Sequence, residues 1–285
     1  IQIGPALKRE GLDTMYDVIL GLPGETYDTA IQTIKDVLNA NVDWINIWTL
    51  MLLDGSELNT PKERKKWTLK SKFRIIPRDF VKLNNGKVVM EIEEVVIGSD
   101  TLSFDEYVEL RLMSLLIKIT SATPCYKSIF KFMQSYNVTI FDLVFSMLKN
   151  THIASDNLQK FFEEFKRYTI DELWDSGEEL IQHYQNPHEY EKLLNGSAGQ
   201  NVAFYFHAIA ISEHMLDFTD FCIKTTKKLI EKNTDEDFVT ELNTISNYCY
   251  GSCQNIFGED RLKSNPEFLF EHDILTWMNT GVTSS

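Results

Sequence analysis

The sequence predicts an α/β part followed by an all-α part, and two observations predict this order. Residues 17–50 contain a short apolar run, a segment with apolar residues at helical spacing, and a second apolar run. This pattern is lost near Ser56, and an almost continuously helical pattern extends from Ser103 to about residue 250. We therefore expect a βαβ piece, a connector with a β-hairpin and a helical domain, covering residues 1–60, 61–102 and 103–285.

The βαβ piece is predicted from the spacing of its apolar residues. Residues 18–20 are continuously apolar, which is typical of a strand covered on both faces. Residues 27–38 place their apolar side chains on one helical face, and the apolar run 45–50 is followed by the turn residues 54–56. Two strands joined by a helix are parallel. Residues 1–10 look like the end of a helix that stops at Gly11, so we expect the chain to begin in mid-fold.

The remaining elements are predicted from turn and cap signals. Asn84-Asn85-Gly86 lies between two alternating segments and predicts a hairpin. Ser103 stands three residues before Glu106, which is the spacing of a capping box at a helix start. We expect the tail, residues 267–278, to pack against the rest of the protein. Further helices are expected at residues 127–135, 140–149, 158–174, 178–185 and 202–232.

Composition excludes several classes of function. The 28 basic and 42 acidic side chains leave a net charge of −14, which opposes binding to nucleic acid or to anionic lipid. The basic run 62–66 is short and is interpreted as a solvated connector. No apolar run approaches the roughly 18 residues of a membrane span. Four cysteines in 285 residues do not make a disulfide scaffold, and no secretory signal precedes them, so we expect a reducing, cytoplasmic setting.

The loop Gly21–Thr26 is the first candidate site. A strand followed by Gly-Leu-Pro-Gly and a helix start places backbone N–H groups and the positive end of the helix dipole at the carboxyl edge of a parallel sheet. Gly21 and Gly24 allow close approach of another molecule, and Glu25 or Thr26 can satisfy N–H groups of the loop. The alternative is that this is only a short βα loop with an N-cap.

Three segments resemble a known family. "DVILGLPGETYDTAIQTI", residues 17–34, closely resembles the late-barrel motif of radical S-adenosylmethionine enzymes. "INIWTLMLLDGSEL" resembles the following barrel strand and its exit. "EEVVIGSDTLSFDEYVELR" is similar to the segment that joins barrel and helical region in the cobalamin-binding branch. The resemblance covers residues 1 to about 115 and implies that this chain holds the last βα units of a partial (βα) barrel, followed by a mostly helical C-terminal domain.

The resemblance also implies chemistry for the parent enzyme. Such an enzyme uses a [4Fe–4S] cluster to cleave S-adenosylmethionine to a 5′-deoxyadenosyl radical, and the branch binds cobalamin. The implied partners are a small-molecule or peptide substrate and the N-terminal portion of the parent. The residues implied to line the adenosine side of the cofactor are Gly21, Leu22, Pro23, Gly24, Glu25, Thr26, Trp48, Leu50 and Leu52.

The cluster-binding part of the family pattern is missing. Three thiolates must hold the cluster while S-adenosylmethionine takes the fourth iron, and residues 1–115 contain no cysteine. Cys249 and Cys253 stand four apart, but Ile256 stands where a third cysteine is needed. We interpret this pair as buried helical neighbours. The cobalamin motif Asp-x-His-x2-Gly is absent too, so the chain alone is predicted to be inactive and to bind none of these cofactors.

The other notable residue groups are explained by structural roles and do not require a functional site. His207 and His214 share one helix face, but no second carboxylate–histidine pair faces them, which disfavours a di-metal site. Aromatic residues of the helices are expected in the core, namely Phe161, Phe162, Phe165, Phe204 and Phe206. Four acidic residues are expected to face solvent, namely Glu63, Glu93, Glu94 and Asp105.

Two classes of function follow from the sequence. The first is the C-terminal portion of a radical S-adenosylmethionine enzyme, which contributes barrel wall and a helical domain that closes over substrate. The second is a non-catalytic module whose helical domain recruits a partner. A Cys-x3-Cys-x2-Cys loop encoded upstream of Ile1 would distinguish them.

Overall fold

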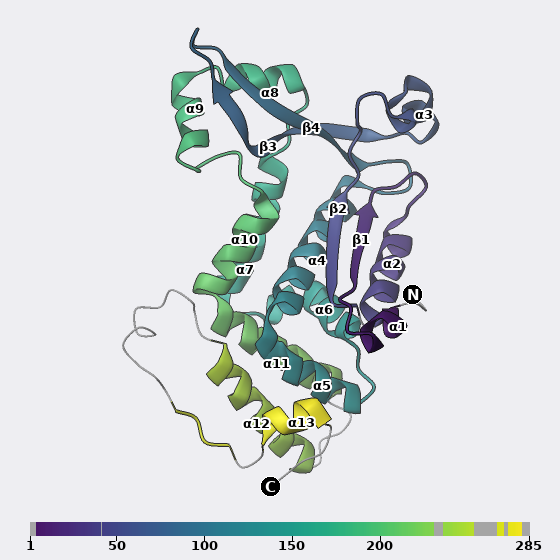
Figure 1. Ribbon diagram of the computed structural model, residues 1–285, viewed down its shortest axis with the longest axis vertical. Helices are drawn as coiled ribbons and strands as arrows, with labels where there is room; N and C mark the ends of the chain where they lie inside the picture. The colour runs from purple at the N-terminus through teal and green to yellow at the C-terminus, as the bar shows by residue number, and fades with distance from the viewer. Residues whose placement is uncertain (1–3, 41, 231–235, 254–266, 271–272, 281–285) are drawn as a thin grey trace. The chain divides into compact units, whose positions relative to one another are not determined.

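A computed structural model describes residues 4–40, 42–230, 236–253, 267–270 and 273–280 and has a mixed α/β fold dominated by helices (Figure 1). The chain divides into two compact units. The first contains residues 1–112 and 164–205, and the second contains residues 113–163 and 206–285. Because residues 164–205 group with the strands, the units are not continuous in sequence and do not coincide with the three expected segments.

The predicted βαβ piece is confirmed at the start of the first unit. Strands β1 (Met15–Leu20) and β2 (Trp44–Thr49) pair in parallel, with Val18 opposite Ile47. Helix α2 (Tyr27–Asn39) connects them. The short helix α1 (Gly4–Arg9) precedes them and is followed by Gly11 at φ +71°.

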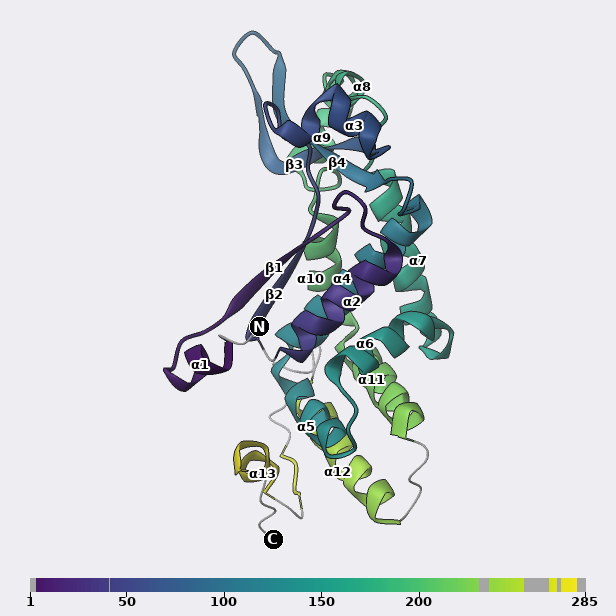
Figure 2. The same ribbon diagram turned by 90° about the vertical axis from the view of Figure 1, so that its right-hand side faces the viewer.

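The two faces of the β1–β2 sheet differ. Figure 2 shows α2 on one side, where Val18 and Leu20 are buried together with Ala30 and Ile34 of the helix. The prediction that this strand is covered on both faces is wrong, because the opposite side chains are largely exposed. We call that surface the open face; it consists of Met15, Asp17, Ile19, Trp44, Asn46 and Trp48.

The predicted hairpin is also confirmed. After η1 (Glu57–Asn59) and α3 (Pro61–Lys66), strands β3 (Lys70–Lys82) and β4 (Val88–Gly98) pair antiparallel around Gly86 at φ +84°. Helix α8 (Gly177–His183) packs against both strands (Figure 1). The core formed there contains Ile75, Val88, Met90, Leu180, Tyr184, Tyr190 and Leu193.

The helical region largely follows the predicted boundaries. The capping box is formed, since Glu106 accepts from the backbone N–H of Ser103 at 2.7 Å. The expected helix 158–174 ends at Asp171, and Trp174 instead pairs with Phe73 of β3. The expected helix 202–232 is interrupted at His214, and its last residues, 231–232, lie outside the described residues. The helices are α4 (Phe104–Ala122), α5 (Lys127–Ser135), α6 (Ile140–Lys149), α7 (Asp156–Asp171), α9 (Pro187–Leu194), α10 (Val202–Glu213), α11 (Met215–Ile230), α12 (Glu236–Ser252) and α13 (Ile274–Thr280), with 3-10 turns η2 (Pro124–Tyr126) and η3 (Thr151–Ile153).

Aromatic residues fill the core of the second unit. Phe161 lies edge-on to Phe206 and Phe218, with ring centroids 5.2 and 5.5 Å away. Four of the five predicted core phenylalanines are buried, but Phe204 is 56% exposed, so that prediction is wrong. In the tail, Ile274 of α13 is buried near α5, whereas Leu269 is fully exposed. The tail prediction is therefore confirmed only for α13, and residues 271–272 lie outside the described residues.

All four cysteines lie in the second unit and are buried. Cys249 lies in α12 and Cys253 directly follows it, so the prediction of two buried neighbours is confirmed. Cys253 is also bonded to Cys125 across a sequence separation of 128, a single disulfide that the sequence analysis did not predict. Within the described ranges, no helix is both long and apolar enough to span a membrane.

Candidate functional site

The loop between β1 and α2 is a tight, glycine-dependent turn. The N–H of Glu25 donates to the carbonyl of Leu22 at 3.0 Å, which places Pro23 and Gly24 at the central positions. Gly24 has φ +78° and Gly21 has φ +88°. Proline followed by a residue with positive φ is typical of a type II turn. Thr26 then caps α2, and its side chain accepts from the N–H of Thr29.

The side chain of Glu25 occupies the N–H groups that the sequence suggested for a ligand. Its carboxylate accepts from the N–H of Gly21 at 2.6 Å. Burial raises the pKa of Glu25 above its ordinary value, and backbone hydrogen bonds from Gly21 and Leu22 oppose that rise. The carbonyl of Glu25 also accepts from Thr101 Oγ1 at 2.7 Å. An anionic ligand at this loop would therefore have to displace a carboxylate that the chain supplies itself.

The glycines face protein atoms at the position where a side chain would begin. A Cβ added at Gly24 would lie 3.6 Å from Trp67 Cζ3, and one added at Gly21 would lie 3.7 Å from Val96 Cγ1. Both distances are ordinary van der Waals contacts. The positive φ angles therefore explain these two glycines without a ligand, in agreement with the alternative interpretation of the loop.

The other implied site residues do not share one exposed surface. Leu50 and Leu52 are buried and pack against Val96 of β4. The backbone of this segment also pairs with β4. The N–H of Val96 donates to the carbonyl of Leu50, and the N–H of Leu52 donates to the carbonyl of Glu94. Trp48, in contrast, is 51% exposed and belongs to the open face.

The open face carries a polar group that sequence reasoning missed. Oδ1 of Asp17 accepts from Trp48 Nε1 at 3.0 Å and from Asn46 Nδ2 at 2.9 Å. These two hydrogen bonds lower the pKa of Asp17 below its ordinary value, and the bond from Trp48 has the larger effect. The carboxylate is therefore charged at neutral pH. Side chains alternate between the two faces along a strand, so residues 15, 17 and 19 share a face, as do residues 44, 46 and 48. This spacing is the sequence signal that would have identified the polar group.

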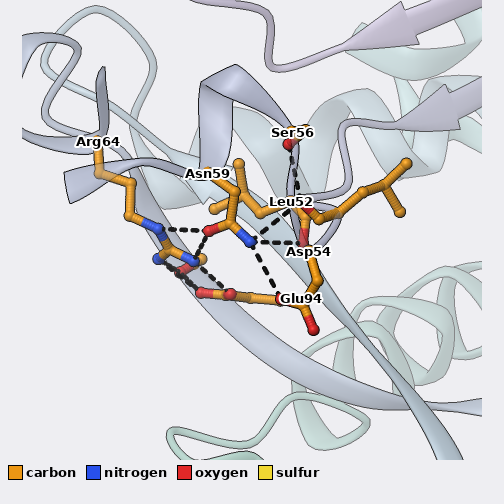
Figure 3. Close-up of polar contacts among 8 residues, drawn as sticks. Leu52, Asp54, Ser56, Asn59, Arg64 and Glu94 are labelled. Atoms are coloured by element: carbon orange, nitrogen blue, oxygen red, sulfur yellow. Dashed lines mark hydrogen bonds and ion pairs between the residues drawn. The ribbon is translucent and has the colours of Figure 1, made fainter. Parts of the chain in front are cut away.

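A polar network holds the segment that follows β2 (Figure 3). Asn59 donates from Nδ2 to the carbonyl of Leu52 at 3.3 Å and accepts from Arg64 Nε at 2.8 Å. Arg64 also pairs with Glu94 of β4, and Ser71 donates to the same carboxylate. The prediction that Glu94 faces solvent is wrong, because its side chain is only 13% exposed.

Glu93 and Glu63 were also expected to face solvent, and this too is wrong. Glu93 pairs with Arg74 of β3, and each side chain is about one-sixth exposed. Glu63 accepts from Trp67 Nε1 at 3.0 Å. The partner of Glu93 lies on the paired strand of the hairpin, whereas the partner of Glu63 lies one helical turn further along, at the end of α3.

A separate cavity of about 290 Å³ lies in the first unit beside the hairpin. Its lining includes the aromatic residues Tyr168, Trp174, Tyr184 and Tyr205. Tyr168 and Tyr205 stack with ring centroids 6.0 Å apart. Arg74 and Glu172 contribute charge to its lining. A neighbouring groove contains the exposed Phe204. The size and the aromatic lining are typical of small-ligand sites.

The cysteines do not fit an iron–sulfur cluster. In the described ranges no three side chains of His, Cys, Asp or Glu are grouped to hold a metal ion. Two of the four cysteines are joined to each other, and burial raises the pKa of Cys222 and Cys249 above that of a free thiol. His207 and His214 are likewise in no such group. A cysteine binds a cluster as a thiolate, so a disulfide and two buried thiols with raised pKa values do not suit that role.

Comparison of the sequence with models of known protein families finds no match, and comparison with curated proteins finds none either.

Proposed function

We propose that the chain is the C-terminal portion of a radical S-adenosylmethionine enzyme of the cobalamin-binding branch. In this proposal β1 and β2 are the last two strands of a partial (βα) barrel, and the open face is the interior side of that barrel. The iron–sulfur cluster is held elsewhere in the parent. The helical region contributes the substrate or partner domain.

The observation that carries the proposal is the open face. Parallel strands in proteins are covered on both sides, yet this two-stranded parallel sheet is covered by α2 on one side only. A second layer of protein or ligand is therefore needed on the side of Trp44 and Trp48, which are 59% and 51% exposed. A barrel supplies that layer, because its strands turn one face inward.

The carboxyl end of the two strands is where we place the cofactor. In α/β sheets, ligands bind at the carboxyl ends of parallel strands. Ile19 and Trp48 lie at that end of the open face, opposite each other in the register, and Asp17 lies beside them. An indole ring and a charged carboxylate suit the adenine ring and ribose hydroxyls of S-adenosylmethionine, by stacking and by accepting hydrogen bonds.

The first test is the coding sequence that precedes Ile1. A Cys-x3-Cys-x2-Cys loop within roughly 200 residues, the size of the missing part of a barrel, is the expected result. A continuous upstream reading frame without such a loop would contradict the proposal.

The second test is a titration of the intact parent with S-adenosylmethionine, followed by tryptophan fluorescence. We expect Trp48→Phe to weaken binding about tenfold, which corresponds to about 1.4 kcal/mol of lost contact. Trp44→Phe is the matched control, because Trp44 lies on the same face at the opposite end of β2. Equal affinity in the two variants would remove the open face from the cofactor site.

A non-catalytic binding module is the second candidate, and the same exposed face favours it. In that case Trp44 and Trp48 would both contact a partner protein. S-adenosylmethionine would not alter the fluorescence of either residue, and both variants would weaken the complex with the partner.

A further inference from the structure

Three cysteines of the second unit meet at one point. Cys125 lies in η2, Cys249 lies in the last turn of α12, and Cys253 directly follows that helix. Cys125 and Cys253 are joined by a disulfide, with their Cα atoms 6.1 Å apart. Helix α12 packs against both η2 and α5, and α13 packs against α5 as well.

The thiol of Cys249 lies beside the backbone of Cys125, one of the two cysteines of this disulfide. Its S–H donates to the carbonyl oxygen of Cys125 at 3.3 Å, and its Sγ lies 3.1 Å from Ser128 Oγ. The N–H of Cys253 donates to the carbonyl of Cys249 at 2.7 Å, so the two residues are one helical turn apart on the same side. Two sulfurs at the end of α12 therefore face one cysteine of η2.

We propose that Cys125, Cys249 and Cys253 form a thiol–disulfide exchange site. The Cys249 thiolate attacks Sγ of Cys125, the bond between Cys125 and Cys253 breaks, and its electron pair leaves on Sγ of Cys253. The proton lost from Cys249 ends on Cys253. One disulfide and one thiol are present before and after, so the exchange needs no oxidant or reductant.

The exchange moves the covalent link by one turn of helix. In the first form η2 is tied to the residue that follows α12, and in the second form it is tied to Cys249 inside α12. The second form leaves Cys253 free of the link, at the point where the chain leaves the helix. Helix α13, further along the chain, is still held on α5, where Lys131 Nζ donates to the carbonyl of Met278 at 2.7 Å.

The surroundings of Cys249 make the exchange slow in the closed structure. Burial raises its pKa to about 11, and hydrogen bonds from Ser128 and Ile129 oppose the rise only in part. Since the thiolate is the attacking species, exchange requires local opening at the end of α12.

Peptide mapping of the full chain tests the proposal. The oxidised protein is held at pH 8 without reductant, quenched in acid, digested with pepsin and analysed by tandem mass spectrometry for the partner of Cys125. We expect both Cys125–Cys253 and Cys125–Cys249 linkages. Cys222→Ser is the matched control, since Cys222 is also buried and free, and it should give the same two linkages. Finding only the Cys125–Cys253 linkage in the wild type would overturn the proposal.

The variant Cys253→Ser supplies the second measurement, and if it folds the proposal requires both results. With oxidised glutathione as the oxidant, Cys125 should pair with Cys249. Circular dichroism and a thermal melt first establish that the variant is folded. If folded Cys253→Ser leaves Cys125 unpaired, bound to glutathione or joined to Cys222, the proposal is wrong. If the variant does not fold, the wild-type mapping decides alone.

Discussion

Arg74 donates from Nη1 to Oε1 of Glu172 at 3.0 Å, although 98 residues separate them in the sequence. The side chains are only 16% and 14% exposed. Glu93 contacts the same guanidinium, and Arg111 lies 3.6 Å from the Glu172 carboxylate. Burial would lower the pKa of Arg74, but the neighbouring carboxylates outweigh it and raise that pKa. This ion-pair group ties β3 to the segment that follows α7 within the first unit.

We predict that Glu172→Gln lowers the free energy of unfolding by about 3 kcal/mol, because it leaves buried positive charge with one partner fewer. Arg167→Ala is the control, since its partner Asp171 and Arg167 itself are both more than half exposed; this variant should cost less than about 1 kcal/mol. Urea denaturation measures both variants. Similar losses in the two would contradict a buried role for Glu172.

We predict that the ionisation of Glu94 makes the free energy of unfolding depend on pH at acidic pH. Burial by itself would raise the pKa of Glu94, but hydrogen bonds from Arg64 and Ser71 and the charge of Arg64 outweigh it and lower the pKa below 4.5. A carboxyl whose pKa is lower in the folded state than in the unfolded state stabilises the protein at pH values above its unfolded-state pKa. This contribution is lost as the pH falls through the folded-state pKa.

The measurement is urea denaturation of the wild type and Glu94→Gln between pH 7 and pH 3. The wild type should be more stable at pH 7, and the two should converge as the pH falls below about 4.5. Glu91→Gln is a matched control on the same strand, because Glu91 is exposed. A constant difference between wild type and Glu94→Gln at every pH would show that the carboxylate charge is not the cause.

We predict that Gly24→Ala costs about 1 kcal/mol or more through the backbone alone. The added methyl has room beside Trp67, but φ of +78° strains any residue with a Cβ. Gly24→Asn should cost less, because asparagine tolerates positive φ better than alanine. Thermal unfolding of the two variants checks this. Equal costs would indicate a clash with Trp67 instead.

We predict that the chain by itself binds no [4Fe–4S] cluster after anaerobic reconstitution with iron and sulfide. The four cysteines lie in the second unit, where two form a disulfide and two are buried thiols with raised pKa values. Iron analysis and the visible absorbance spectrum give the answer. Stoichiometric iron that disappears in Cys249→Ser would contradict the prediction and make Cys249 a ligand.

Local patterns of the sequence determined the elements near the proposed site. The strand–helix–strand order of residues 15–49, the Asn84-Asn85-Gly86 hairpin and the Ser103–Glu106 cap were all predictable. Each depends on residues a few positions apart, through side-chain spacing, turn conformation or capping. The same local signals indicated that the side chain of Glu25 or Thr26 can accept hydrogen bonds from backbone N–H groups of the loop and the helix start, and both side chains do so.

Tertiary packing decided the contacts between elements that are far apart in the sequence. Glu93 and Glu94 are largely shielded from solvent because the hairpin and α3 bring Arg74 and Arg64 to them. A charged residue on a strand otherwise predicts exposure. The open face exists because nothing in the described first unit covers the side of β1–β2 opposite α2. Cys125 and Cys253 meet across 128 residues because α12 packs against η2. Sequence spacing carries no signal for such contacts, since they depend on how separate elements pack and not on the period of any one of them.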